Sequence, residues 1–319
     1  MYTNSASAMN LQNNHLLAAI DLGSNSFHIL IVDLSSGHVV PLRRWGEKVQ
    51  LAADFQSDEK LSAAAEQRAL HCLQGFAGEL AGIPSGNISV VGTDIFRRAK
   101  DIDTFLEHIQ AILHAPVKVI TGEEEAQIIF RGVLAHQKEK DIDTLVLDIG
   151  GGSTEIAIGN GDCIKLAGSL PLGCIEYGKN FFPEHRSSPE VFFQAVARIR
   201  TVIEPMMGEF QTHSWQRVIG SAGTVLAIES VLQGLHFSYS GISRNNLAML
   251  VEHLCCNCSI DDMELVGLPQ RRSDIFLSGI AILAAFFEVL DISEIQTCPH
   301  DIREGIIATM LEKRRVGTA

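Results

Sequence analysis

The sequence predicts two α/β domains, each built on a mixed β-sheet between layers of helices. With 319 residues, 46% of them hydrophobic, the chain is long enough for two domains with separate cores. One strand-turn-strand pattern occurs twice, once near the start and once near the middle of the chain. Each copy is followed by segments in which strands alternate with helices, as in three-layer α/β domains.

The repeated pattern is an apolar strand that ends in Asp, a turn of small residues, and a second strand with alternating apolar residues. AIDLGSNSFHILIVD begins at Ala19 and VLDIGGGSTEIAIGN begins at Val146, so that Asp21 aligns with Asp148. Both copies read D-[LI]-G-x-x-S-x-x-I-x-I, and each is followed by a further turn, SSG or GNGD. Each copy therefore predicts a three-stranded β-meander that opens a domain.

The small residues in the two turns indicate an anion site. Glycines there can adopt positive φ and allow backbone N–H groups to converge on an anion without a Cβ in the way. A plain hairpin turn is the alternative for either copy alone. Because Asp and Ser recur in register, we favour two phosphate-binding turns that face each other across an interdomain cleft.

The segments between and after the two copies predict alternating strands and helices. NISVVGT, from Asn87, predicts a strand followed by a helix that carries Arg97 near its start. The segments from Trp215 and from Ile295 each predict a strand, a loop and a helix. We place the first domain at residues 1–135, with a C-terminal helix at about 305–319 packed back on it, and the second at 136–304.

The composition limits the partners and the location. A formal net charge of −13 argues against broad binding to nucleic acid or to anionic membranes. The apolar segment 276–287 is shorter than the ~20 residues that span a bilayer, so it predicts a buried helix. Residues 1–14 do not resemble a secretory signal. We expect a cytoplasmic protein without a membrane or nucleic-acid partner, and a homodimer is left open.

Outside the CCNC cluster the seven cysteines form no C-x-x-C pair, so reduced thiols are expected. The CCNC cluster that begins at Cys255 could bind a soft metal, but a helix with small apolar thiols is the favoured interpretation.

The segment TGEEEAQIIFRGVL predicts a helix with an acidic first turn. Thr121 and Glu124 have the spacing of a capping box, and acids in the first turn suit the helix dipole. Glu125 lies along the margin of the apolar stripe formed by Ala126, Ile129 and their neighbours. Helix geometry leaves two readings equally open: a carboxylate that touches water in a cleft, or a structural acid.

Eight ordered blocks resemble the exopolyphosphatase / guanosine pentaphosphate phosphohydrolase (Ppx/GppA) family. They extend from about Ala18 to Met310 and read AAIDLGSNSFHILIVD, VVGTDIFRRAKD, ITGEEEAQIIFRGV, LVLDIGGGSTEIAIGNG, SLPLGC, VIGSAGT, RRSDIFLSGIAIL and DIREG. The resemblance implies two ribonuclease H-like domains of the actin-like ATPase and sugar-kinase superfamily, with a cleft between them. It also implies removal of the terminal phosphate from polyphosphate or from pppGpp, with Mg²⁺ as the cofactor.

The resemblance assigns roles to individual positions. It implies that Glu125 is the catalytic glutamate and that Asp148, with Glu155 just beyond, binds the metal. The phosphate-binding positions that it implies are Ser24, Asn25, Ser26, Arg97, Gly151, Gly152, Ser153, Arg272 and Arg303.

The chain departs from the family pattern near its end. Cys298-Pro299-His300-Asp301 precedes Arg303 where relatives have a Ser…Gly-x-Arg arrangement, which puts a backbone contact of this loop with the ligand in doubt. We expect His300 to be a solvated neighbour of Asp301 rather than a catalytic residue. We also expect a short family form, without the helical region related to HD hydrolases.

Two other functions fit the same motifs. A sugar kinase or ATPase would use the paired turns to hold ATP, and a non-catalytic sensor would bind (p)ppGpp without turnover. The acidic and basic residues at the implied catalytic positions favour the hydrolase.

Overall fold

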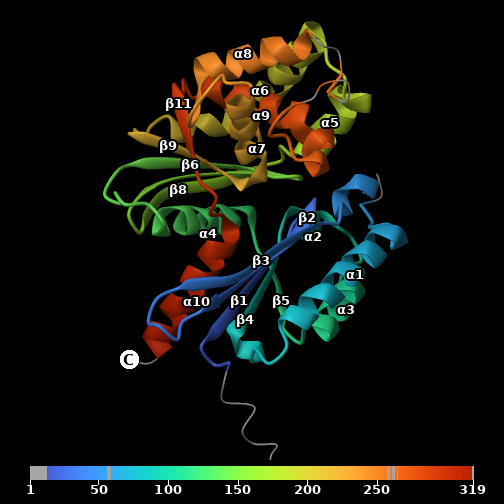
Figure 1. The fold of residues 1–319 in the computed structure, drawn as a ribbon, viewed down its shortest axis with the longest axis vertical. Coiled ribbons are helices and arrows are strands. Elements are labelled where there is room, and N and C mark those ends of the chain that lie inside the picture. The colour runs from blue at the N-terminus through green and yellow to red at the C-terminus, as the bar shows by residue number, and fades with distance from the viewer. Residues whose placement is uncertain (1–12, 56–58, 257–258, 261–262, 264, 318–319) are drawn as a thin grey trace, which may run out of the picture. The chain divides into compact units, whose positions relative to one another are not determined.

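A computed structural model describes residues 13–317 except 56–58, 257–258, 261–262 and 264. These residues form two compact units, drawn in Figure 1. The first comprises the described part of Met1–Ile120 and Ile306–Ala319, and the second is Thr121–Gly305.

The first unit is built on a five-stranded sheet with the order β3-β2-β1-β4-β5. Its first three strands form an antiparallel meander, as the repeat predicts, and β4 and β5 add in parallel. The strands are β1 (Leu16–Leu22), β2 (Ser26–Asp33), β3 (Val40–Lys48), β4 (Ile88–Gly92) and β5 (Val117–Val119).

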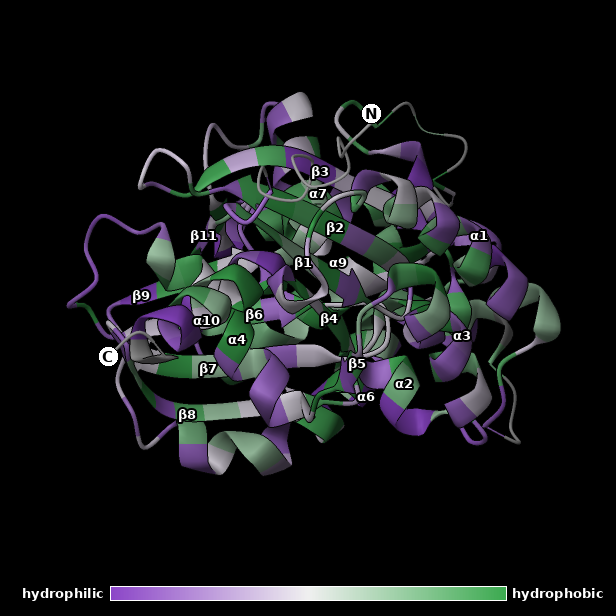
Figure 2. Cartoon of the chain, turned by 90° about the horizontal axis from the view of Figure 1, so that it is seen from below, coloured by the Kyte–Doolittle hydropathy of each residue, from purple (hydrophilic) through white to green (hydrophobic). Residues whose placement is uncertain are grey.

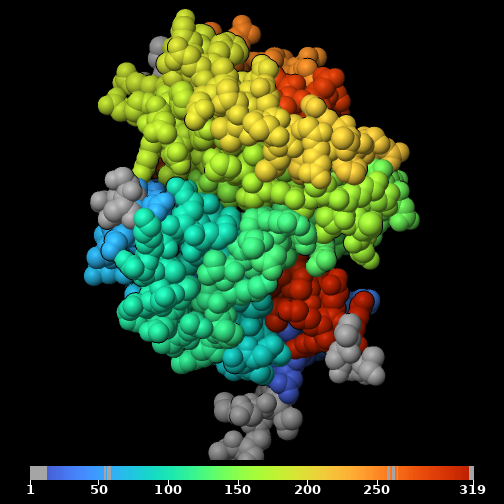
Figure 3. Space-filling view, turned by 180° about the vertical axis from the view of Figure 1, so that it is seen from behind, coloured from blue at the N-terminus to red at the C-terminus, as the bar shows by residue number. Residues whose placement is uncertain are grey.

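Helices cover both faces of this sheet. The helices are α1 (Ala63–Glu79), α2 (Asp94–Arg98), α3 (Asp103–Leu113) and the C-terminal α10 (Ile302–Gly317). In Figure 1, α1 and α3 lie on one face and α10 lies on the other. Figure 2 shows hydrophobic colour along β1, β2 and β4, because these strands are buried between the helices. Figure 3 shows the C-terminal segment, in red, at the surface of this unit, where Arg314 donates a hydrogen bond to the side chain of Asn87.

The second unit repeats this topology. Its six-stranded sheet has the order β10-β11-β9-β6-β7-β8, with an antiparallel meander of β6, β7 and β8 and parallel pairing of β6 with β9 and of β9 with β11. The strands are β6 (Thr144–Ile149), β7 (Thr154–Asn160), β8 (Cys163–Leu170), β9 (Arg217–Ser221), β10 (Ile242–Ser243) and β11 (Glu294–Thr297).

In the second unit, α4 lies on one face of the sheet and α7 and α9 lie on the other (Figure 1). The helices are α4 (Gly122–Ala135), α5 (Cys174–Phe181), α6 (Pro189–Phe210), α7 (Ala222–Gly234), α8 (Arg244–Cys255) and α9 (Ser273–Val289). Short 3₁₀ turns lie at Leu51–Asp54, Ser85–Asn87, Pro183–His185 and Gln270–Arg272. The apolar segment 276–287 lies inside α9 and is almost entirely buried, which confirms the predicted buried helix.

The predicted fold class, two α/β domains of the ribonuclease H-like kind, is confirmed. The boundary between the two units differs from the predicted domain boundary at residue 135, because α4 belongs to the second unit. The ring of Phe130 lies directly over Gly159 of β7, and Gly132 lies against the backbone of Asp301 and Gly305. The Phe130 contact and the packing of α4 on β7 and β8 join α4 to the second sheet. Within the described residues, no helix is both long enough and apolar enough to cross a membrane.

Candidate functional site

Four polar side chains form a row across the second sheet. Asp148 of β6 lies opposite Ser221 of β9 on one side and opposite Glu155 of β7 on the other, and Glu155 lies opposite Ser169 of β8. Directly opposed residues of neighbouring strands project from the same face of a sheet. The sheet register therefore brings the two predicted metal ligands together, flanked by two serines.

Hydrogen bonds connect this row. The Ser221 hydroxyl donates to Oδ2 of Asp148 at 2.5 Å, and the Ser169 hydroxyl donates to Oε1 of Glu155 at 2.7 Å. Asp148 is 7% exposed, Glu155 3% and Ser221 0%. Two neighbouring buried carboxylates repel each other unless donors or a cation stabilise them.

The glycine turn beside this row is held by the start of α5. The N–H of Gly150 donates to the carbonyl of Ser153 at 2.9 Å and closes the turn. The N–H groups of Cys174 and Ile175 donate to the carbonyls of Gly150 and Gly151 at 3.1 and 3.0 Å. With these carbonyls fixed, the orientation of the turn's amide groups is fixed as well, as an anion site requires.

A cationic side chain, Arg272, packs against the turn from β9 to α7. Ala222 adopts φ +62°, a left-handed conformation that is unusual for a residue with a side chain. The Arg272 guanidinium lies directly against Gly223, where any side chain would overlap it. Burial lowers the pKa of Arg272, while the neighbouring Asp148 carboxylate opposes this shift. An arginine remains protonated in such surroundings, so Arg272 supplies positive charge near the row.

The first unit brings Ser24 and Arg97 together through a residue that the sequence analysis did not select. Ser24 Oγ lies 3.5 Å from Oδ2 of the buried Asp94, and an Arg97 Nη atom lies 4.0 Å from its Oδ1. Arg97 also donates to the carbonyl of Ile120 at 3.0 Å. The side-chain oxygen of Asn25 is buried and has no hydrogen-bond partner within the described part of the chain. A buried side-chain oxygen of this kind can accept a hydrogen bond from a bound ligand or water.

Helix α4 begins with the predicted capping box. The Thr121 hydroxyl accepts from the N–H of Glu124, and the Glu124 carboxylate accepts from the N–H of Thr121. Glu123 is exposed, whereas Glu125 is only 7% exposed. Helix geometry left two readings open, and the structure shows that Glu125 is mostly buried, to the same extent as Asp148. Its catalytic role stays a prediction.

The loop before α10 holds Arg303 in place. Asp301 accepts two hydrogen bonds from the Arg303 guanidinium, at 2.9 and 2.6 Å. The His300 ring stacks on His136 with 3.6 Å between ring centroids, and its Nδ1 lies 3.6 Å from Glu304. His300 is thus a packed residue rather than the solvated neighbour of Asp301 that was expected. The phosphate-binding role of Arg303 stays a prediction.

The two carboxylates of the row are the groups that could hold a metal ion. Mg²⁺ is commonly bound through one or two carboxylates, with water and substrate phosphate completing its coordination, so Asp148 and Glu155 fit it. No group of three or more His, Cys, Asp or Glu side chains able to hold a metal occurs among the described residues. In the CCNC cluster, Cys258 lies outside the residues that the structure describes. Burial raises the pKa of the Cys255 thiol.

Three residues at the site were not predicted from the sequence: Ser169, Ser221 and Asp94. All three lie within the blocks quoted above, but no local pattern identifies them. Their partners are set by strand register and by loop packing, which become visible only in the folded sheet.

A family model and curated proteins match most of the chain. The Ppx/GppA phosphatase family matches residues 30–314. A guanosine-5'-triphosphate,3'-diphosphate pyrophosphatase from Vibrio campbellii is 38% identical over 305 residues, which cover 94% of this chain and 60% of that protein. The protein of the same name from Aeromonas hydrophila is 36% identical over 301 residues, covering 94% of this chain and 60% of that protein. The chain therefore spans about three fifths of the length of these relatives.

Solved structures share the fold. An exopolyphosphatase from Cytophaga hutchinsonii superimposes with a TM-score of 0.84 at 23% identity, covering 93% of this chain and 98% of that one. The Ppx/GppA protein of Aquifex aeolicus gives a TM-score of 0.77 at 21% identity, covering 94% and 98%. The match over residues 30–314, the ordered motifs and the shared fold lead to one conclusion: the chain belongs to the Ppx/GppA phosphatase family.

Proposed function

We propose that this chain is a phosphohydrolase that releases the terminal phosphate of inorganic polyphosphate or the 5′-γ-phosphate of pppGpp. The observation that carries the proposal is the pair of buried carboxylates, Asp148 and Glu155, beside a glycine turn whose carbonyl groups are tied back. Phosphoryl transfer to water depends mainly on positioning and on neutralisation of charge. This arrangement offers both.

Asp148 and Glu155 would hold Mg²⁺. A bound magnesium ion neutralises charge on phosphate oxygens and helps to orient them. Arg272, which the Asp148 carboxylate influences electrostatically, adds positive charge on the same side of the unit. The two carboxylates, the arginine and the turn amides together suit a substrate that carries several negative charges.

Backbone amides and side chains at the two turns would bind the phosphates. In the second unit these are Gly151, Gly152 and Ser153. In the first unit Ser24, Asn25 and Ser26 form the equivalent turn, and Asp94 holds Ser24 and Arg97 near each other. We propose the same role for Arg303, whose guanidinium is oriented by Asp301.

Glu125 would orient and deprotonate the attacking water. Its position in the first turn of α4 favours the ionised form through the helix dipole, whereas its burial disfavours that form.

The names of the relatives support both substrate classes, pppGpp and polyphosphate, without deciding between them. The deciding experiment is phosphate release measured side by side on long-chain polyphosphate, tripolyphosphate, pppGpp and ATP. Because the net charge of −13 opposes a long polyanion, we expect faster release from tripolyphosphate or pppGpp than from long chains. Absence of release from all four substrates would exclude the hydrolase.

A glutamine variant tests the catalytic glutamate. Glu125→Gln should fold normally and bind substrate, but release phosphate at least ~100-fold more slowly, the usual scale for loss of a general base. Circular dichroism serves as the folding control. An unchanged rate would remove Glu125 from the mechanism.

One second candidate is a non-catalytic sensor of (p)ppGpp, which would use the same phosphate-binding turns. A sensor would bind pppGpp in equilibrium dialysis and leave it intact after prolonged incubation with Mg²⁺. A hydrolase would convert it to ppGpp and phosphate.

We also propose a cytoplasmic location, which fractionation of the source cells would test.

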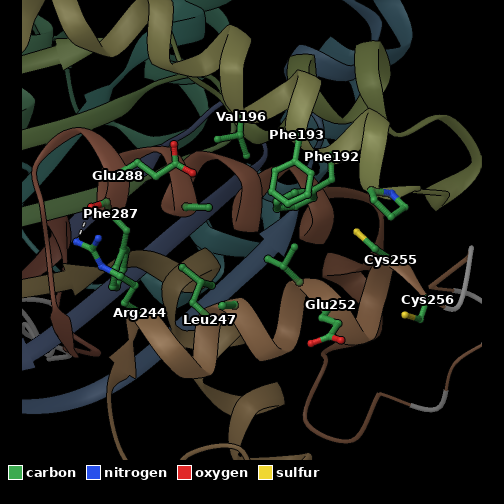
Figure 4. Close-up of a pocket in the computed structure, with 14 residues that line it drawn as sticks. Phe192, Phe193, Val196, Arg244, Leu247, Glu252, Cys255, Cys256, Phe287 and Glu288 are labelled. Atoms are coloured by element: carbon green, nitrogen blue, oxygen red, sulfur yellow. Dashed lines mark hydrogen bonds between the residues drawn. The ribbon is translucent and has the colours of Figure 1, made fainter.

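A homodimer stays a prediction. An apolar groove of about 340 Å³ between α6, α8 and α9, shown in Figure 4, is the surface to examine. Phe193 at its edge is 60% exposed, and Met249 of α8 is 47% exposed. Analytical ultracentrifugation of the wild type and of Phe193→Asp checks this: a dimer that dissociates in the variant supports it, and a monomeric wild type excludes it.

A further inference from the structure

We infer that Ser221 and Ser169 are positioning residues that hold the carboxylates of Asp148 and Glu155 for a divalent cation. The inference rests on the proposed function, since it assigns the cation to these two carboxylates. It extends the site from two residues to a row of four that crosses strands β9, β6, β7 and β8.

The sheet pairs each serine with one carboxylate. Each serine is the direct cross-strand partner of the carboxylate to which it donates, Ser221 across the parallel β9–β6 pair and Ser169 across the antiparallel β7–β8 pair. The donor–acceptor distances are 2.5 and 2.7 Å. Sheet register therefore fixes each hydroxyl beside one particular carboxylate oxygen, without help from a loop.

Electrostatics favours a hydroxyl group as the partner of each carboxylate. An ionised carboxylate only accepts hydrogen bonds, so a hydroxyl donor stabilises the charged form, which is the form that binds metal. The serines bring no positive charge of their own, so they do not compete with a cation for the two carboxylates. A lysine or arginine at either position would neutralise one carboxylate and compete with the metal.

The corresponding row of the first sheet lacks both serines. In the first sheet the positions that correspond to Ser221 and Ser169 are Val91 and Gly46, which flank Asp21 and His28. That row has one carboxylate and no serine hydroxyl. The two hydroxyls therefore occur only in the row with paired carboxylates, which ties them to that pair rather than to the sheet topology.

Loss of either serine hydroxyl should weaken divalent-cation binding by a measurable factor. Groups that orient metal ligands typically contribute 10- to 100-fold to metal affinity or activity. We expect Ser221→Ala and Ser169→Ala each to weaken divalent-cation binding by about tenfold or more. Substrate affinity at saturating Mg²⁺ should change little, because neither serine belongs to the phosphate-binding turns.

The experiment is a titration of the full chain with Mn²⁺, without substrate, followed by electron paramagnetic resonance of the free ion. Mn²⁺ serves as the probe because it shares the oxygen-ligand preference of Mg²⁺. Wild type, Ser221→Ala, Ser169→Ala and Ser169→Thr are compared. The threonine variant keeps a hydroxyl and suits a β-strand, so it should retain wild-type affinity.

Thr144→Val is the matched control. Thr144 is a buried hydroxyl on the same strand as Asp148, and it donates to a backbone carbonyl rather than to a carboxylate. This variant should lose stability but keep Mn²⁺ affinity. If the alanine variants bind Mn²⁺ as tightly as the wild type, the inference fails while the proposed function stands. If the wild type binds no Mn²⁺, the inference fails and the proposed function is decided by phosphate release alone. If the wild type binds Mn²⁺ but releases no phosphate from any substrate, the proposed function fails.

Discussion

The two sheets carry the same row of positions with different chemistry. Across β4, β1, β2 and β3 of the first unit the row reads Val91, Asp21, His28, Gly46. Across β9, β6, β7 and β8 of the second unit it reads Ser221, Asp148, Glu155, Ser169. The aspartate is common to both rows, and its neighbours differ. A repeated fold therefore preserves a position without preserving its role.

In the first row the residue opposite the aspartate is a histidine. His28 Nδ1 lies 3.7 Å from Asp21 Oδ2, and Gly46 leaves room for the imidazole, because a Cβ there would overlap the ring. In the second row the opposing residue is a second carboxylate. The first row thus sets one carboxylate beside an imidazole, whereas the second sets two carboxylates side by side, each with a hydroxyl donor, an arrangement that suits a cation.

The turns that follow the two aspartates are built alike. Gly23 donates to Ser26 at 3.2 Å, and Gly150 donates to Ser153 at 2.9 Å. In each unit the chain that follows the third strand ties back turn carbonyls: Gln50 donates to Asn25 at 2.8 Å, and Ile175 donates to Gly151 at 3.0 Å. Phosphate binding by amides is therefore proposed for both turns, and metal binding only for the second row.

The largest expected difference is between the two aspartates. Asp148→Asn should raise the Mg²⁺ concentration that gives half-maximal phosphate release by about 100-fold, the upper end for residues at metal sites. Asp21→Asn should leave that concentration unchanged. Phosphate release measured over a range of Mg²⁺ concentrations checks both. An equal loss for Asp148→Asn at every Mg²⁺ concentration would give it a structural role instead.

A second variant converts one row into the other. Glu155→His combined with Ser169→Gly gives the second row the histidine and glycine of the first, so its aspartate gains an imidazole partner. We expect Mn²⁺ affinity to fall by more than about tenfold. Ser169→Gly alone is the control and should show the smaller effect of losing one hydroxyl. Retained affinity in the double variant would break the comparison.

A smaller effect is expected from the support of the second turn. A Cβ at Gly173 would overlap the backbone of Gly151 and Gly152. Gly173→Ala should therefore displace the turn amides and raise KM about tenfold, which corresponds to about 1.4 kcal/mol of binding, with little change in kcat. Gly208→Ala is the control, since nothing lies within 4 Å of a Cβ there. A change in kcat alone would contradict the assigned role.

The smallest effect concerns buried thiols, which the two units treat alike. Burial raises the pKa of Cys72 in the first unit to about 12 and that of Cys174 in the second to about 11. At pH 8 both groups stay protonated, and a thiol reacts mainly as its thiolate. Iodoacetamide at pH 8 should modify the exposed Cys163 and spare Cys72 and Cys174, as read by peptide mass spectrometry. Rapid labelling of Cys174 in the folded protein would show that its surroundings open.

Local chemistry made much of the fold predictable. Strand alternation and turn residues identified both meanders, the Thr121–Glu124 spacing identified the capping box, and an apolar run identified α9. These features depend on residues a few positions apart. The metal pair and the phosphate-binding positions came from the resemblance to a family, with Glu125 selected in the same way.

The sequence by itself determined the two meanders, their glycine turns and the aspartate at each. Only the tertiary structure decided that Ser221 and Ser169 meet the paired carboxylates, that Arg272 lies on Gly223, and that Glu125 is buried. The physical reason is distance along the chain. Periodicity and turn chemistry act between near neighbours, whereas strand register and burial depend on segments that meet only after the sheet has assembled.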